Sequence, residues 1–241
     1  DRFLLGRVQG SAVVGLYRQS YQLVVAPMNQ LMGPLYQVSL PGLSMLQDDP
    51  ARYARAYTGI VSFVALTSMP IAVLVAVCAE EVALVMLGSQ WTGAAIYVRV
   101  FAIGSLVQSV FSTIGFVLVS RGRSAELLGL TTLHVGVRVT MMCLGAVWGG
   151  LGVAVADMSS TAVVFVPYLR RALKGSPVSV GAFMASVGRP LGASMLLAAL
   201  LTLMKLSSPV TVPAGILAAA FIAMNQICPT FAIGSDARRT T

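Results

Sequence analysis

Charged residues are scarce in this chain. Only 10% of its 241 residues are charged, with eight Asp and Glu in all and a single His, whereas 57% are hydrophobic. Soluble domains carry about 25% charged residues. This scarcity excludes an ordinary water-soluble domain and predicts an all-α integral membrane protein.

Motifs of catalysis are missing as well. No glycine-rich loop ends in Gly-Lys-Ser or Gly-Lys-Thr, so there is no phosphate cradle for ATP. The few acids stand mostly in loops, and no span combines paired carboxylates or a nucleophile with a base. The three cysteines, Cys78, Cys143 and Cys228, lie in apolar runs without metal-ligand spacing. We expect no enzyme, no cofactor and no metal, and energy from an ion gradient or the substrate's own gradient.

The net charge of +8 does not indicate a nucleic-acid partner. A nucleic-acid footprint needs basic residues clustered on one face, whereas here they are spread over short loops between apolar runs. If the loop after the first span is cytoplasmic, that side holds ten Lys and Arg and the opposite side holds five. The positive-inside rule then predicts a cytoplasmic C-terminus.

The apolar runs predict about seven membrane spans, each long enough to cross hydrocarbon as a helix. They are expected at about 21–40, 57–79, 94–120, 127–147, 151–169, 190–206 and 210–233. The short apolar run 82–90 is expected to be interfacial or re-entrant. The segments are then a periplasmic-side entry (1–20), a bundle of five spans (21–169), a basic cytoplasmic connector (170–189), two additional helices (190–233) and a cytoplasmic tail (234–241).

The first of these spans is unusual because prolines recur in it every seven residues, at Pro27, Pro34 and Pro41. Proline removes a backbone donor and clashes with the preceding turn, so this helix is expected to be kinked. Asn29, Gln30 and Gln37 lie among the prolines. An amide facing lipid finds no hydrogen-bonding partner. These three side chains should therefore either join neighbouring helices or line a wet cavity.

The same stretch carries an ordered set of short motifs. They are GLYR (15–18) with YQL (21–23), PMNQ (27–30) with GP (33–34), LPGLS (40–44) and LQDDPARY (46–53). Together they resemble the Wzx-type polysaccharide flippases, in the polysaccharide transporter family of the multidrug/oligosaccharidyl-lipid/polysaccharide (MOP) exporter superfamily. LGSQW (87–91), followed by the two alanines at 94 and 95, resembles a glycine and tryptophan motif of the same family.

This resemblance implies a fold and a function. Family members have 12 to 14 spans in two pseudo-symmetric bundles, and this chain resembles the second bundle plus two extra helices, with an N-terminal transporter bundle as its missing partner. The implied activity is the flipping of an undecaprenyl-pyrophosphate-linked oligosaccharide across the bacterial inner membrane, for exopolysaccharide, O-antigen or capsule assembly. The alternatives are a cation-coupled small-molecule exporter of the same superfamily and a non-transporting, truncated membrane protein.

Arg138 is the foremost candidate for a functional residue, because a charge in mid-span costs about 2.5–3.5 kcal/mol even on lenient insertion scales. His134, one turn earlier, shares its face. Asp157 on the next span lies within about 5 Å of the same depth, at 1.5 Å per residue, which predicts an Arg138–Asp157 ion pair. The pair is either structural or part of the translocation cavity, with Arg138 on a lipid pyrophosphate and Asp157 or His134 in ion coupling. Arg18, near the outer interface, either joins this cavity or snorkels.

Overall fold

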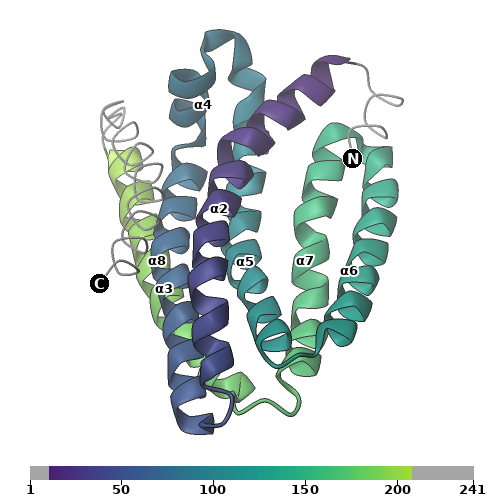
Figure 1. Cartoon of the computed structure of the whole chain (residues 1–241). Coiled ribbons are helices and arrows are strands. Elements are labelled where there is room, and N and C mark those ends of the chain that lie inside the picture. The colour runs from purple at the N-terminus through teal and green to yellow at the C-terminus, as the bar shows by residue number, and fades with distance from the viewer. Residues whose placement is uncertain (1–10, 208–241) are drawn as a thin grey trace, which may run out of the picture.

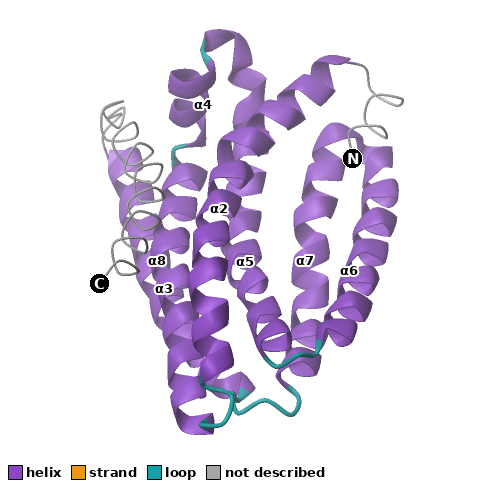
Figure 2. Ribbon diagram, viewed as in Figure 1, coloured by secondary structure: helices purple, strands orange, loops and turns teal. Residues whose placement is uncertain are grey.

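The structure, a computed structural model, describes residues 11–207. These residues form helices joined by short turns and loops, and no strand occurs among them. In order they are α2 (Ser11–Met45), α3 (Pro50–Val77), α4 (Ala79–Leu87), η1 (Ser89–Ala94), α5 (Ala95–Ser120), α6 (Ser124–Gly145), η2 (Ala146–Trp148), α7 (Gly149–Leu173) and α8 (Val180–Ser207) (Figures 1 and 2). The expected all-α fold is confirmed. The expected span 210–233 and the tail 234–241 lie outside the described residues.

Four stretches of residues 11–207 are long and apolar enough to cross a membrane. They are Pro50–Val77, Ser89–Ser120, Ser124–Leu173 and Val180–Leu206, and the third contains both α6 and α7. These stretches confirm an integral membrane protein. Helix α2 has sufficient length, 35 residues, but is not among the four. The amides and prolines that interrupt its apolar residues account for this, and the count of seven spans stays a prediction.

Two helices extend further than the sequence suggested, so the connector is shorter than 170–189. Helix α7 continues to Leu173 and α8 already begins at Val180, with Pro190 in its interior. A proline at this position leaves the carbonyl of Ser186 without its helical donor. The Ser62 hydroxyl on α3 donates to that carbonyl oxygen at 3.2 Å. This interhelical bond explains why the helix passes through Pro190 instead of starting there.

The helices form a row in which α8, α3, α5, α7 and α6 are successive neighbours, and α2 packs mainly against α5. Figure 1 shows α8 at one side and the α6–α7 hairpin at the other. It also shows that α2 is bent, as its three internal prolines predict. Helix α6 packs mainly against α7, so most of its surface is exposed.

The loops α2–α3, α5–α6 and α7–α8 lie together at one end of the bundle, where the helices of the row end or begin (Figure 1). These loops and the helix ends beside them carry Arg52, Arg55, Arg121, Arg123, Arg170, Arg171 and Lys174. The structure thus gathers seven of the twelve Lys and Arg of residues 11–207 at one end of the bundle, as the positive-inside rule requires. Which compartment this end faces stays a prediction.

At the opposite end of the bundle, two ion pairs stabilise the break between α3 and α4. Arg99 donates from Nε to the carbonyl of Ala76 at 3.3 Å and pairs with Glu80 at 3.2 Å. Lys205 donates to the carbonyl of Val77 at 3.2 Å and pairs with Glu81 at 2.7 Å. Each cation therefore satisfies a carbonyl at the end of α3. The interfacial placement expected for 82–90 stays a prediction, although α4 is short, at nine residues.

The buried core is divided along the length of the helices into two large apolar clusters and a small one of Met28 and Ala72. One large cluster lies toward the basic end and includes Tyr53, Tyr57, Phe111, Ile114 and Tyr168. The other lies toward the α6–α7 turn and includes Tyr17, Val98, Phe101, Met142 and Val153. Between them, at the middle of α5 and α7, the buried side chains are polar: Ser105, Ser109, Asp157, Ser160 and Thr161. We call this region the polar layer.

The α6–α7 hairpin depends on a close approach of two glycines. A Cβ at Gly145 would lie 2.5 Å from the carbonyl oxygen of Gly152 and 2.8 Å from Cβ of Ala156. A Cβ at Gly136, on the same helix, would meet nothing within 4 Å. Small residues that allow such backbone contact are a common basis of helix association in membranes.

Gly145→Ala should therefore lower the free energy of unfolding by about 1–3 kcal/mol, the usual cost of overpacking. Gly136→Ala is the matched control, and should be neutral or stabilise by up to about 1 kcal/mol, since alanine favours the helix. Unfolding in mixed detergent micelles measures both. Equal stability of the two variants would contradict the close approach.

Candidate functional site

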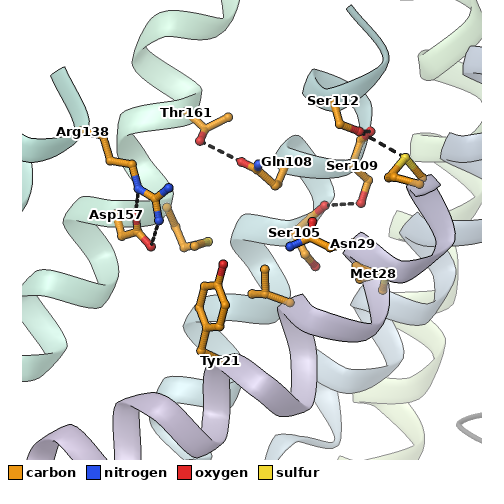
Figure 3. A pocket seen from close by; sticks show the side chains of 13 residues that line it. Tyr21, Met28, Asn29, Ser105, Gln108, Ser109, Ser112, Arg138, Asp157 and Thr161 are labelled. Carbon is orange, nitrogen blue, oxygen red and sulfur yellow. Dashed lines mark hydrogen bonds and ion pairs between the residues drawn. The ribbon is translucent and has the colours of Figure 1, made fainter. Parts of the chain in front are cut away.

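Asp157 is the centre of the polar layer. Its side chain is 1% exposed and accepts from three donors. Arg138 donates from Nε to Oδ1 and from Nη2 to Oδ2, the latter at 3.0 Å. The hydroxyl of Tyr17 donates to Oδ2 at 3.3 Å. The ion pair expected from the sequence is present, and it is bidentate (Figure 3).

The hairpin sets the depth at which the two charges meet. Gly149, with φ of 86°, begins α7 directly after the short helix η2 and reverses the chain. The glycine contact described above then brings the two helices together, so Arg138, seven residues before the end of α6, faces Asp157, eight residues after the start of α7. Asp157 is enclosed, whereas the Arg138 side chain is 39% exposed. Only two of the five guanidinium N–H groups are used on Asp157, so others can meet a ligand.

Tyr17 connects this pair to α2 and was not expected to do so. Its ring packs edge-on against Phe101, with ring centres 5.1 Å apart, and stacks on Tyr21 at 6.4 Å. These contacts fix the direction of the hydroxyl. In the sequence, Tyr17 and Tyr21 were interpreted only as part of a family pattern. Their spacing of four residues puts both side chains on one helix face, and this spacing could have predicted the contact.

A small cavity lies beside the ion pair. It is lined by Tyr21, Val25, Met28, Asn29, Met32, Ser105, Gln108, Ser109, Ser112, Arg138, Asp157, Met158 and Thr161. About 40 Å³ is open to water-sized molecules, which is room for a few waters but not for a sugar. Figure 3 shows the Tyr21 hydroxyl directed toward the Arg138–Asp157 pair. A large substrate would therefore lie against this site and not within it.

Helix α5 contributes a polar stripe that was not predicted from the sequence. Ser105, Gln108, Ser109 and Ser112 follow one another at helical spacing and all line the cavity. The three serine hydroxyls donate to carbonyls of their own helix, at 2.7 to 2.8 Å. Their lone pairs thus face the cavity as acceptors. The sequence could have predicted this stripe, because four polar residues recur on one face of an otherwise apolar span.

His134 lies next to the cavity but does not line it. Its Nε2 is 3.5 Å from the hydroxyl of Thr161, and that hydroxyl donates to Gln108 at 2.9 Å. Its ring packs edge-on against Phe111 with centres 4.9 Å apart. Within residues 11–207, no group of three His, Cys, Asp or Glu side chains is arranged to hold a metal ion.

The remaining candidates on α2 are separated from one another. Asn29 lines the cavity, while Gln30, Gln37 and Arg18 are exposed. At 100° per residue, Arg18 lies about 20° from Asn29 on the helical wheel, whereas Gln30 and Gln37 lie about 100° from both. Among residues 11–207, Arg18 has no ion pair or hydrogen bond. The structure therefore groups Arg138, Asp157 and Asn29, leaves Arg18 on the cavity-facing side of α2, and turns the two glutamines away.

A helical membrane bundle with a buried charged layer is typical of membrane transport proteins. Comparison with known proteins narrows this class. A family model described as "Polysaccharide biosynthesis protein" matches residues 1–96. These matched residues include α2, α3 and α4 with Arg18 and Asn29, but neither Arg138 nor Asp157.

Two curated proteins are similar to the chain. A protein described as "Uncharacterized membrane protein in cps region", from Klebsiella pneumoniae, is 19% identical over 161 residues, which are 66% of this chain and 33% of that protein. The "Teichuronic acid biosynthesis protein TuaB" of Bacillus subtilis (strain 168) is 23% identical over 124 residues, or 52% of this chain and 26% of that protein. No solved structure matches.

Together these matches show that the chain is similar to a polysaccharide biosynthesis family, to a membrane protein of a cps region and to a teichuronic acid biosynthesis protein. The resemblance found in α2 is thus supported. The chain spans between a quarter and a third of the length of the two curated relatives.

A double-mutant cycle tests the energetic role of the ion pair. Asp157→Leu leaves a guanidinium without a counter-ion and Tyr17 without its acceptor, and should lower the free energy of unfolding by about 2–3 kcal/mol. This figure lies below that of a fully buried pair because Arg138 is partly exposed. The double variant Arg138→Met/Asp157→Leu should recover most of the loss. A double variant that is less stable than Asp157→Leu would contradict the coupling.

Proposed function

We propose that the chain forms one wall of the translocation path of a flippase for lipid-linked oligosaccharides in the bacterial inner membrane. The substrate is an oligosaccharide on undecaprenyl pyrophosphate, destined for an exported polysaccharide. The observation that carries the proposal is the polar layer, which contains a bidentate ion pair between α6 and α7 inside the bundle.

The chemistry of the layer suits such a substrate. Flipping moves a charged pyrophosphate and a hydroxyl-rich glycan through about 30 Å of hydrocarbon. Guanidinium groups bind phosphate oxygens in pairs, and Arg138 keeps unused N–H groups next to the cavity. Arg18, exposed and without a counter-ion among the described residues, offers a second guanidinium on the same side of α2. The serines of α5 and the amides of Asn29 and Gln108 can exchange hydrogen bonds with sugar hydroxyls.

The exposed polar face of α2 favours a second bundle as partner. Gln22, Asn29 and Arg18 are exposed on a helix that lies among membrane spans. Polar groups at membrane depth are tolerated only against protein or in a water-filled cavity. A second bundle facing α2 would enclose this side and leave the outer faces of α6 and α8 to lipid. The chain spans only a quarter to a third of the two curated relatives, so each of them has length enough for a further bundle.

The cluster of basic residues at one end supports a cytoplasmic position for that end. A cation-coupled small-molecule exporter is the second candidate, favoured by the buried carboxylate of Asp157. The ion pair favours the first candidate, because Arg138 already occupies both carboxylate oxygens. A cation would have to displace the guanidinium, while an anionic substrate is attracted by it.

Translocation of a lipid-linked oligosaccharide should therefore depend on the two arginines. With the completing bundle present, Arg18→Gln and Arg138→Gln should each lower the translocation rate in proteoliposomes at least tenfold, since each removes a phosphate ligand. Arg52→Gln is the control: its guanidinium is 68% exposed at the basic end, far from the cavity, and the rate should stay unchanged. Normal rates in folded Arg18→Gln and Arg138→Gln protein would refute the proposed function.

A further inference from the structure

Among residues 11–207, the carboxylate of Asp157 has a single cationic partner. Within residues 11–207 the other acids, Asp48, Asp49, Glu80, Glu81 and Glu126, lie near helix ends. Arg138 donates to both oxygens of Asp157, and the only other donor to them among residues 11–207 is the neutral hydroxyl of Tyr17. Within the described part of the chain, the negative charge of this enclosed side chain is therefore balanced by one guanidinium.

An anion that binds Arg138 must disturb this balance, and it has two ways to do so. If it takes the Nε and Nη2 donors, it displaces Asp157 and leaves a buried carboxylate without a cation, which is strongly unfavourable. If it takes the outer N–H groups instead, Asp157 stays in place but lies a few ångströms from the new negative charge. In both arrangements, protonation of Asp157 relieves the excess of negative charge.

We propose that binding of a phosphate group at Arg138 is coupled to the uptake of one proton by Asp157. This inference rests on the proposed function, because it takes the substrate's phosphate as the ligand of Arg138. The step is a simple protonation: a carboxylate oxygen of Asp157 gains a proton from water, Arg138 stays a guanidinium, and no other bond is formed or broken. The adjoining cavity, with about 40 Å³ open to water-sized molecules, gives the proton a source.

The groups that face Asp157 identify the competing proton acceptors. They are Arg138 and His134 on α6 and Tyr17 and Tyr21 on α2, while α5 contributes only uncharged side chains, Ser105, Gln108, Ser109 and Ser112. Guanidinium and phenol groups keep their protons at neutral pH. His134 is the one alternative, since its ring reaches the layer through Thr161.

Proton uptake also affects the connection between helices. The hydroxyl of Tyr17 donates to Oδ2, which ties α2 to the α6–α7 hairpin. A protonated Asp157 has one oxygen that donates instead of accepting, and its charge no longer strengthens the bond to Tyr17. Substrate binding would thereby weaken the contact between α2 and the hairpin.

Calorimetric titration with farnesyl diphosphate, a short isoprenyl diphosphate, tests the inference on the purified protein at pH 8. Repeating the titration in buffers of different ionisation enthalpy gives the number of protons taken up. We expect about one proton per diphosphate, and an affinity that falls about tenfold from pH 7.5 to 8.5, as one linked proton requires. Asp157→Asn should bind farnesyl diphosphate at least as tightly as the wild-type protein, with proton uptake near zero. Any uptake that remains in this variant measures protonation of the diphosphate itself. His134→Gln should keep the uptake.

The outcomes separate this inference from the proposed function. Binding to the wild-type protein without proton uptake would overturn the coupling and leave the function standing. Loss of proton uptake in His134→Gln together with normal uptake in Asp157→Asn would also overturn the coupling to Asp157 and leave the proposed function standing. No binding to the wild-type protein, or equal binding to Arg138→Gln, would overturn the proposed function itself. Inorganic pyrophosphate should bind at least tenfold more weakly; equal affinity would assign the site to free phosphate and overturn the lipid-linked substrate.

Discussion

A carboxylate enclosed at the middle of a membrane bundle must have its charge balanced by groups from other helices. In this chain Asp157 of α7 is balanced by Arg138 of α6 and accepts a further hydrogen bond from Tyr17 of α2. Each partner is placed by its own local structure: Arg138 by the glycine-mediated hairpin, and Tyr17 by the aromatic contacts with Phe101 and Tyr21. The polar layer exists because these three helices meet there.

The rest of the bundle can be understood around this layer. Two apolar clusters enclose it from both ends and keep it at mid-depth. The row from α8 to α6 leaves one side of α2 exposed, and on that side lie Arg18 and Asn29. Polar groups that are costly in lipid are thus concentrated on one face, where a second bundle can enclose them. Anion recognition and proton uptake are two consequences of the same charge balance.

Much of this arrangement followed from sequence patterns, for physical reasons. The scarcity of charge and the apolar runs predicted the helical membrane fold, and residue counting from the hairpin turn predicted that Arg138 meets Asp157. The length of α8 was missed because Ser62, from another helix, compensates for Pro190. Tyr17, Gln108 and the serines of α5 were missed because each hydrogen-bonding side chain was judged alone. Gln30 and Gln37 do not line the cavity because of the direction that α2 takes after its kinks. The spacing of its prolines predicted kinks but not that direction.

The central claim is that the polar layer and the adjoining face of α2 are in contact with water inside the membrane. Reaction of a cysteine at position 29 with a membrane-impermeant, charged thiol reagent tests it most directly, in a background where Cys78, Cys143 and Cys228 are replaced. Leu196 on α8, 66% exposed on an apolar surface, is the matched position. We predict that Asn29→Cys reacts rapidly, is protected by an isoprenyl diphosphate, and that Leu196→Cys does not react. A cysteine at position 29 as unreactive as the one at 196, in folded protein, would contradict the account.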